Sequence, residues 1–250
     1  MLHYQVIENG KENVVFLHGF LEDSTMWNGL TTDLPFRIIL IDLPGHGKSK
    51  PINSSEITLF EFAESVTKII EKECQSTSFS IVGHSLGGYV ALELLKQERV
   101  KPEKTILFHS HPWADSEAKK AERLKVVDVI KTNKKMFLNV AIPHLFYKPE
   151  LYSSEISHLI SSAMEMDSFS IAATTLAMRN RGEYLEVLEK NKEEICVIQG
   201  EKDNLIPFHK MKNLYKKIKF KGYFLEGVGH MSHIESPKEI VRIFKQELKS

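Results

Sequence analysis

The sequence predicts an α/β protein, a doubly wound and mostly parallel sheet with an inserted all-helical segment. Short apolar segments alternate with helical patterns over residues 1–111 and again over 183–250, which is typical of a parallel sheet covered on both faces. Residues 112–182 contain amphipathic helical pattern broken at Pro143 and Pro149, with no convincing strand. We therefore expect one core domain, 1–111 and 183–250, interrupted by several short helices over 112–182.

The expected strands are short segments that alternate or run apolar, followed by turn-forming residues. They cover residues 3–8, 13–17, 36–41, 79–82, 104–109, 194–199 and 220–225.

The expected helices follow these strands. A helix capped by Asp23 or Ser24 comes after the second strand, and residues 58–74 carry an apolar stripe at helical spacing with Thr58 as the cap. Further helices are expected from 85 to about 97 and after Pro207. The last helix is expected to open at Ser236-Pro237 with Glu239 completing a capped N-terminus.

Composition narrows the classes of function. The 250 residues carry 33 Lys and Arg against 33 Asp and Glu, so no basic surface for nucleic acid is indicated. No run of about 18 apolar residues predicts a membrane span, and the N-terminal residues lack the pattern of a signal peptide. Cys74 and Cys196 are expected to be free buried thiols in a reducing cytosol. We expect a cytoplasmic protein with a small-molecule substrate.

The segment Gly83-His84-Ser85-Leu86-Gly87 is a G-x-S-x-G sequence between an apolar strand pattern and a helical pattern. A sharp strand-to-helix turn needs small residues beside it, and it exposes the serine hydroxyl at the helix N-terminus. Amide groups there can hold developing negative charge.

A serine nucleophile needs a base and a group that orients the base. Asp203 and His230 each lie in a loop directly after an expected strand, where open α/β sheets place their sites. The order of Ser85, Asp203 and His230 along the chain is that expected of α/β-hydrolases.

The sequence resembles the α/β-hydrolase-fold serine hydrolases over nearly its whole length outside residues 112–182, which would correspond to the cap domain. The resemblance rests on five motifs in the family's order: residues 18–20, 42–49, 83–88, 200–203 with Pro207, and 229–230. It implies that Ser85 is the nucleophile, His230 the general base and acid, and Asp203 its orienting acid. The backbone N–H groups of Phe20 and Leu86 would form the oxyanion hole.

Several of these assignments have alternatives in the sequence. Glu201 or Asp115 could be the acid in place of Asp203, and His233 lies three residues after His230. Loop position and the preceding glycine favour Asp203 and His230.

The roles of four other histidines can also be considered from the sequence. The family resemblance implies that His18 and His84 orient the loops around the oxyanion hole. His109 and His111 could face the pocket together or be packed residues. No H-E-x-x-H or similarly spaced cluster is present, and residues 42–49 match neither phosphate-binding glycine motif, so no metal or cofactor is expected.

Apolar residues of the insertion are expected mainly to form its own core, with a subset lining a substrate pocket. The expected substrate-binding residues are Tyr89, His111, Leu145, Phe146, Met178 and Met231.

The expected activity is hydrolysis of a small or medium, largely apolar carboxylic ester through an acyl-enzyme. Epoxide hydrolases and haloalkane dehalogenases of this fold use aspartate at the elbow, so the serine argues against both. Similar menaquinone-pathway lyases have arginine directly after S-x-G-G, where this chain has Tyr89, although Arg123, Arg179 or Arg181 could bind a carboxylate. Carbon–carbon hydrolases and non-catalytic receptors of this fold are further alternatives.

Overall fold

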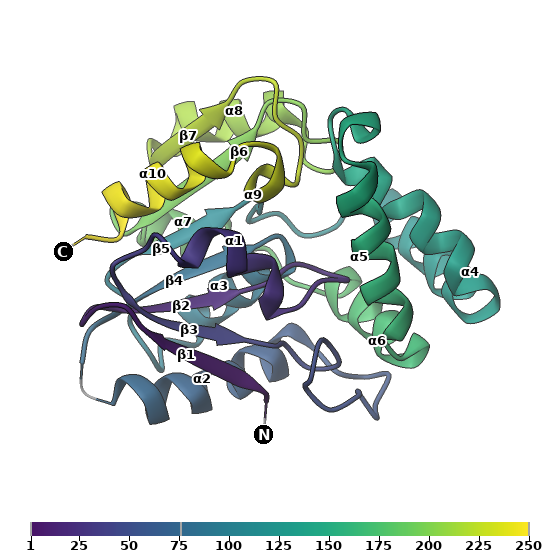
Figure 1. The fold of residues 1–250 in the computed structure, drawn as a ribbon, viewed down its shortest axis with the longest axis horizontal. Helices are drawn as coiled ribbons and strands as arrows, with labels where there is room; N and C mark the ends of the chain where they lie inside the picture. The colour runs from purple at the N-terminus through teal and green to yellow at the C-terminus, as the bar shows by residue number, and fades with distance from the viewer. Residues whose placement is uncertain (1, 76, 250) are drawn as a thin grey trace.

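The computed structural model describes residues 2–75 and 77–249, and within them the chain forms one seven-stranded sheet (Figure 1). The strands are β1 (Tyr4–Glu8), β2 (Asn13–Leu17), β3 (Arg37–Ile41), β4 (Phe79–His84), β5 (Thr105–Phe108), β6 (Ile195–Gly200) and β7 (Lys221–Leu225). Their order across the sheet is β1-β3-β2-β4-β5-β6-β7. β1 pairs antiparallel with β3 and every other neighbouring pair is parallel, which confirms the predicted fold class.

Helices cover both faces of the sheet, and the alternation of side chains along the strands explains why. Val14 and Phe16 of β2 pack on one face, and Val15 and Leu17 pack on the other. All four are at most 1% exposed, which is typical of a strand buried on both sides. The core helices are α1 (Asn28–Thr31), α2 (Leu59–Cys74), α3 (Leu86–Gln97), α7 (Leu185–Lys190), α8 (Phe208–Ile218), α9 (Ser232–Glu235) and α10 (Pro237–Glu247), with a 3₁₀ helix, η1 (Ser24–Trp27), before α1.

Two predicted helix starts are confirmed. Thr58 caps α2, with its backbone N–H donating to Glu61 Oε2 at 2.8 Å. Asp23, one of two candidates, caps η1 by accepting from the Thr25 N–H at 2.8 Å.

The last helix starts at Pro237 directly after Ser236, as predicted, but the expected capping bonds at Ser236 are not formed. Its backbone N–H donates to the Ser232 carbonyl of α9 at 2.8 Å, so it is not free for Glu239 to accept, and its side chain makes no capping bond. Glu239 instead pairs with Arg242 at 2.7 Å. The sequence pattern did not predict the short α9, and this helix uses the Ser236 N–H that the cap required.

A helical insertion lies between β5 and β6 and contains no strand among its residues, all of which the structure describes. Its elements are α4 (Glu117–Ala141), η2 (Pro143–Leu145), η3 (Pro149–Leu151), α5 (Ser153–Glu165) and α6 (Ser168–Arg179). In Figure 1 they form a group at one side of the sheet. The loops that follow β6 and β7 touch η2: Asn204 donates to the His144 carbonyl at 3.0 Å, and the His230 N–H donates to the Leu145 carbonyl at 2.8 Å. The insertion therefore covers the edge of the sheet where the parallel strands end.

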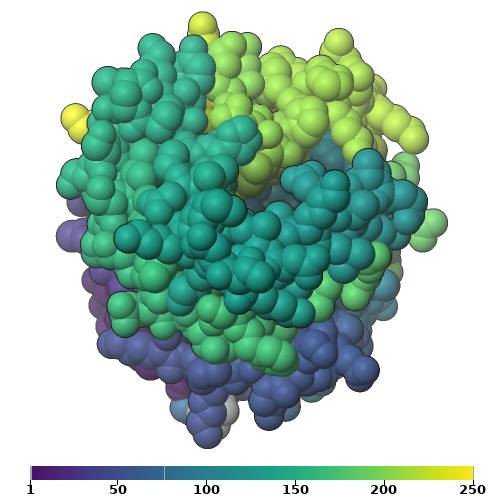
Figure 2. Space-filling view, turned by 90° about the vertical axis from the view of Figure 1, so that its right-hand side faces the viewer, coloured from purple at the N-terminus to yellow at the C-terminus, as the bar shows by residue number. Residues whose placement is uncertain are grey.

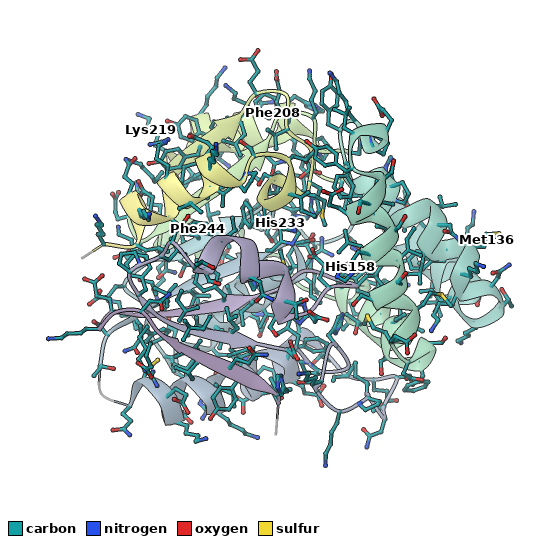
Figure 3. The ribbon with its side chains drawn as sticks, viewed as in Figure 1. Met136, His158, Phe208, Lys219, His233 and Phe244 are labelled. Atoms are coloured by element: carbon teal, nitrogen blue, oxygen red, sulfur yellow. The ribbon has the colours of Figure 1, made fainter. Side chains whose placement is uncertain are left out.

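The expectation of several short helices needs one correction, because α4 is 25 residues long. Asn133 interrupts it with non-helical backbone angles, and its side chain accepts from the Met136 N–H at 3.0 Å, as a cap does. Met136, labelled in Figure 3, is 51% exposed at the outer edge of the insertion. Among the described residues, no helix is both long and apolar enough to cross a membrane.

Candidate active site

Ser85 lies at the turn between β4 and α3 in a backbone conformation that L-residues rarely adopt, with φ of 49°. The glycines on either side are required by space. A Cβ on Gly83 would lie 2.4 Å from the Gly87 carbonyl oxygen, and one on Gly87 would lie 2.3 Å from the Leu17 carbonyl oxygen. The strained turn is therefore built by the G-x-S-x-G sequence, and it holds Ser85 at the N-terminus of α3.

Asp203 and His230 meet beside this turn. His230 Nδ1 lies 2.8 Å from Asp203 Oδ2, and both side chains are buried. Within residues 2–75 and 77–249, Ser85 Oγ has no hydrogen-bond partner. The arrangement leaves His230 Nε2 available to a hydroxyl.

The Asp203 carboxylate is held by donors on both oxygens. Oδ1 accepts from the Leu205 and Ile206 N–H groups at 2.8 and 3.1 Å. Oδ2 accepts from Gln199 Nε2 at 3.0 Å as well as from His230. Burial would raise the pKa of Asp203, but the charge of His230 and the histidine hydrogen bonds hold it well below its usual value. Asp203 is thus an ionised carboxylate with a fixed orientation.

The pKa of His230 is raised by its acidic neighbours. Burial alone would lower its pKa, but the charge and hydrogen bond of Asp203, together with the charges of Glu22 and Glu235, outweigh burial and raise the pKa above its ordinary value. Since Nδ1 donates to Asp203, the neutral ring keeps an unprotonated Nε2, which can accept a proton.

His109 is a second histidine on the same carboxylate. Its Nδ1 lies 3.1 Å from Asp203 Oδ2, its Nε2 lies 2.7 Å from Ser232 Oγ, and its φ is 47°. Burial lowers the pKa of His109 to about 4, so the ring is neutral, donating to Asp203 and accepting from Ser232. The sequence left its role open. Its place at the end of β5, beside the strand that precedes Asp203, is the one signal that could have indicated it.

His109, Asp203 and His230 also have ligand atoms within 4.8 Å of one another, as a metal site would. However, both imidazole Nδ1 atoms face the same carboxylate oxygen as hydrogen-bond donors, and His109 Nε2 is engaged by Ser232. Hydrogen bonding therefore accounts for the cluster.

Two backbone N–H groups beside Ser85 have no acceptor in the described part of the chain, those of Phe20 and Leu86. The loop that carries Phe20 is tied to the elbow, because the Gly87 N–H donates to the His18 carbonyl at 3.1 Å. His18 fixes the loop further: its Nδ1 donates to the Gly19 carbonyl at 2.7 Å, and its Nε2 accepts from the Leu43 N–H at 2.9 Å.

Glu22 connects the loop of residues 18–20 to the turn between β4 and α3, and through His84 to the loop that carries His230. Its Oε2 accepts from the Gly19 N–H at 3.1 Å and from His84 Nδ1 at 2.9 Å, while His84 Nε2 lies 3.1 Å from the His230 carbonyl. Both ring nitrogens of His84 therefore face oxygen atoms. Despite burial, which would raise it, the charge of His84 lowers the pKa of Glu22 to about 2. No pattern in the sequence indicated Glu22.

Replacing Glu22 by Gln is expected to destabilise the fold, because it removes a buried carboxylate that faces both the Gly19 N–H and His84 Nδ1. Loss of one partner of a buried ion pair costs about 3–5 kcal/mol. The lowered pKa of Glu22 means that its stabilisation is complete above about pH 4.5 and is lost as pH falls toward 2. Urea unfolding at neutral pH measures the change. Glu56→Gln, on an exposed loop, is the control, and an equal stability of both variants would contradict this role.

The residues considered as alternatives to Asp203 and His230 have other partners. Asp115 pairs with Arg123 and Arg181, and Glu201 is near Lys202. His233, labelled in Figure 3, lies 3.5 Å from Glu22 Oε1 and makes no contact with Asp203.

Glu235 is another residue that the sequence did not indicate. Its carboxylate accepts from the backbone N–H groups of Tyr147 and Gly229, both at 2.9 Å, and of Met231 at 3.3 Å. It thereby fixes the loop that carries His230 against the insertion.

The expected substrate-binding residues fall into two sets. Tyr89 and His111 contact each other, with Tyr89 Oη 2.9 Å from His111 Nε2, and Leu145 is half-buried next to the His230 loop.

The second set is packed in apolar clusters. Phe146 stacks on Tyr152 and shares the core of the insertion with Met231, and Met178 packs in the cluster that includes α3. Each is at most 3% exposed, the burial of a packing residue.

The face that carries the insertion is hollowed between teal residues of the insertion and yellow-green residues that follow β6 (Figure 2). Separately, a cavity of about 340 Å³ lies between α5 and the segment after Phe20, with Glu22 and His233 in its lining.

Comparisons with known proteins agree with this architecture. A family model described as "alpha/beta hydrolase fold" matches residues 12–105. A probable lysophospholipase, BODYGUARD 1 of Arabidopsis thaliana, is 37% identical over 91 residues, covering 34% of this chain and 19% of that protein. A putative 2-succinyl-6-hydroxy-2,4-cyclohexadiene-1-carboxylate synthase of Haemophilus influenzae is 36% identical over 91 residues, covering 36% of each. These alignments span much less than two thirds of either relative.

A solved structure extends the likeness to the whole chain. A thermophilic esterase from Thermogutta terrifontis superposes with a TM-score of 0.90 at 23% identity, covering 99% of this chain and 92% of that one. The matched family model and the shared architecture show that this chain has the α/β-hydrolase fold.

Proposed function

We propose that this chain is a serine hydrolase that cleaves small carboxylic esters through an acyl-enzyme. The observation that carries the proposal is a buried, hydrogen-bonded Asp203–His230 pair next to the strained turn of Ser85, where His84 Nε2 lies 3.1 Å from the His230 carbonyl. The free N–H groups of Phe20 and Leu86 beside that turn support it.

Each group has a role in the proposed mechanism. Ser85 Oγ attacks the ester carbonyl carbon while His230 Nε2 takes the hydroxyl proton, and Asp203 stabilises the imidazolium that forms. The tetrahedral oxyanion accepts from the N–H groups of Phe20 and Leu86, at the N-terminus of α3. His230 then gives its proton to the leaving alcohol and later takes one from water, which releases the acid.

A panel of acyl esters, amides and ring-cleavage diketones tests this proposal and its alternatives together. Ester turnover that depends on Ser85 supports the proposal. The similarity to a synthase over 91 residues makes lyase chemistry the second candidate. Diketone cleavage without ester turnover would favour carbon–carbon hydrolysis, and ligand-dependent stabilisation without any turnover would favour a receptor.

The pH dependence of kcat/KM should show an acid limb set by His230. The base must be neutral to accept a proton, and the pKa of His230 is raised above 6.5, so activity should rise as pH increases through a midpoint above that value. An ester without ionisable groups avoids titration of the substrate. A profile that is flat from about pH 5 to 9 would contradict a histidine base.

Selectivity for chain length is expected to depend on the insertion at Leu145. Its carbonyl accepts from the His230 N–H, so the residue lies beside the loop of the proposed base, and its side chain is half-buried. Since one methylene in an apolar pocket is worth about 1–3 kcal/mol, Leu145→Ala should change the ranking of kcat/KM across acyl lengths by about tenfold or more.

Phe146→Ala is the matched comparison for Leu145→Ala. Phe146 is 1% exposed in the core of the insertion, so its loss should lower stability by about 3–5 kcal/mol. Kinetics and thermal melts of both variants separate selectivity from packing. An unchanged ranking in a folded Leu145→Ala protein would exclude Leu145 as a selectivity residue.

A further inference from the structure

Arg181 lies just after α6, where the insertion returns to the core, and its side chain is fully buried. Its Nη1 donates to Asp115 Oδ1 at 2.8 Å and to the Met178 carbonyl at 2.7 Å. Its Nε and Nη2 have no hydrogen-bond partner among the residues that the structure describes. Buried charged N–H groups without acceptors are costly, so they indicate that acceptor atoms are supplied by something else.

The Tyr89 ring stacks on the Arg181 guanidinium, and the Tyr89 hydroxyl can donate a hydrogen bond. The Arg181 guanidinium carbon is 4.1 Å from the centroid of the Tyr89 ring. The backbone N–H of Trp113 donates to His111 Nδ1 at 3.3 Å, so neutral His111 carries its proton on Nε2 and donates it to Tyr89 Oη, 2.9 Å away. The hydroxyl proton of Tyr89 is then left to donate to another acceptor.

Positive charge exceeds negative charge around His111. Asp115 is shared between Arg181 and Arg123, while Lys210 Nζ lies 4.0 Å from the centroid of the Trp113 ring. That ring stacks on His111 at 4.9 Å. Burial, followed by the charges of Arg181, Lys210 and Arg123, lowers the pKa of His111 well below its ordinary value.

A second buried carboxylate, Glu93 on α3, accepts from Tyr184 Oη at 2.7 Å. Of the three cations, Arg181 is fully buried, Arg123 is partly buried and Lys210 is exposed, and the charge of Asp203 opposes theirs at His111.

We propose that Arg181, Tyr89 and the cations around them form a subsite for a carboxylate group carried by the substrate. Nε and Nη2 of one guanidinium form a fork that matches the two oxygens of a carboxylate, and the Tyr89 hydroxyl adds a third donor. Tyr89 lies one helical turn after Ser85, with its N–H directed at the Ser85 carbonyl at 3.3 Å. One turn is about 5.4 Å, so the carboxylate would lie a few bonds from the scissile carbonyl. This inference rests on the proposed ester hydrolysis and adds that the ester is a half-ester of a short dicarboxylic acid.

A purely structural role is the competing explanation, because the Asp115–Arg181 pair joins the two ends of the insertion. A structural role would affect stability, but it would not make turnover depend on the charge of the substrate.

The test compares monomethyl succinate, glutarate and adipate with methyl esters of monocarboxylic acids of similar length. The measured quantity is the ratio of kcat/KM for the charged ester to that for the neutral ester. For Arg181→Met we expect this ratio to fall by about tenfold to a hundredfold, the usual effect of losing hydrogen bonds to a charged group. Arg179→Met is the matched control, since Arg179 donates to the Lys120 carbonyl and to Asn180 instead, and it should leave the ratio unchanged.

If Arg181→Met does not fold, Tyr89→Phe provides the test, because this substitution removes only the hydroxyl. It should lower the same ratio by about threefold to tenfold. An unchanged ratio in folded Arg181→Met, or in Tyr89→Phe where that variant is the only one available, would overturn the subsite while leaving ester hydrolysis in place.

Binding gives a readout that does not need turnover. Glutarate should raise the melting temperature of the unsubstituted protein and of Arg179→Met, while neutral glutaramide should not. Stabilisation by glutarate that is lost in Arg181→Met, in a protein that hydrolyses no ester, would support the subsite and reject the proposed reaction. Equal effects of glutarate and glutaramide would overturn the subsite.

Discussion

Ser85→Ala is expected to abolish ester hydrolysis and leave the fold intact. Loss of a nucleophile in a serine hydrolase typically costs about 10⁴–10⁶ in turnover. Alanine removes only the hydroxyl, and Ser85 Oγ has no hydrogen-bond partner in the described chain, so stability should change little. Steady-state kinetics on the best ester of the panel, together with a thermal melt, measures both quantities.

Ser157→Ala is the control for this variant, because Ser157 lies on the exposed side of α5 and its hydroxyl donates to the Ser153 carbonyl at 2.7 Å. It should keep full activity. Residual activity of Ser85→Ala above about a tenth of wild type would reject Ser85 as the nucleophile.

Asp203→Asn is expected to lower kcat by about 10³–10⁴. The backbone N–H groups of Leu205 and Ile206 require an oxygen at the Oδ1 position, so the new amide nitrogen must lie where Oδ2 was. That position receives donors from Gln199, His109 and His230. In Asp203→Asn the N–H on His230 Nδ1 would therefore face the N–H groups of the new amide. His230 avoids this clash of donors only as the tautomer protonated on Nε2, and that tautomer cannot accept the proton of Ser85.

Glu201→Gln is the matched control for Asp203→Asn. Glu201 lies two residues earlier in the same loop, and its carboxylate is near Lys202 rather than a histidine. It should retain activity within about twofold, as surface substitutions usually do. Comparable losses in the two variants would show that the loop, and not the Asp203 carboxylate, is responsible.

The sequence predicted the features that depend on local pattern. Alternating residues such as Val14 and Val15 pack on opposite faces of the sheet. The turn around Ser85 depends on glycines within two residues of it, so it too could be predicted. Asp203 and His230 were placed at strand ends, and parallel strands bring such ends to one edge.

Contacts between distant segments could not be predicted in this way. His109 and Asp203 are 94 residues apart, and Glu22 and His84 are 62 apart. No periodicity links such pairs, because the contact depends on how whole loops are placed. The failed cap at Ser236 has the same cause on a smaller scale, since the preceding turn takes its N–H.

Labelling by an organophosphonate tests the central claim most directly, because it reports which atom is the nucleophile. The protein is incubated with an alkyl fluorophosphonate, and intact-mass and peptide mass spectrometry locate the adduct. We expect one adduct, on Ser85, that requires His230 and Asp203 and is absent from Ser85→Ala. A protein that hydrolyses esters but forms no adduct, or forms it on another residue, would contradict the assignment.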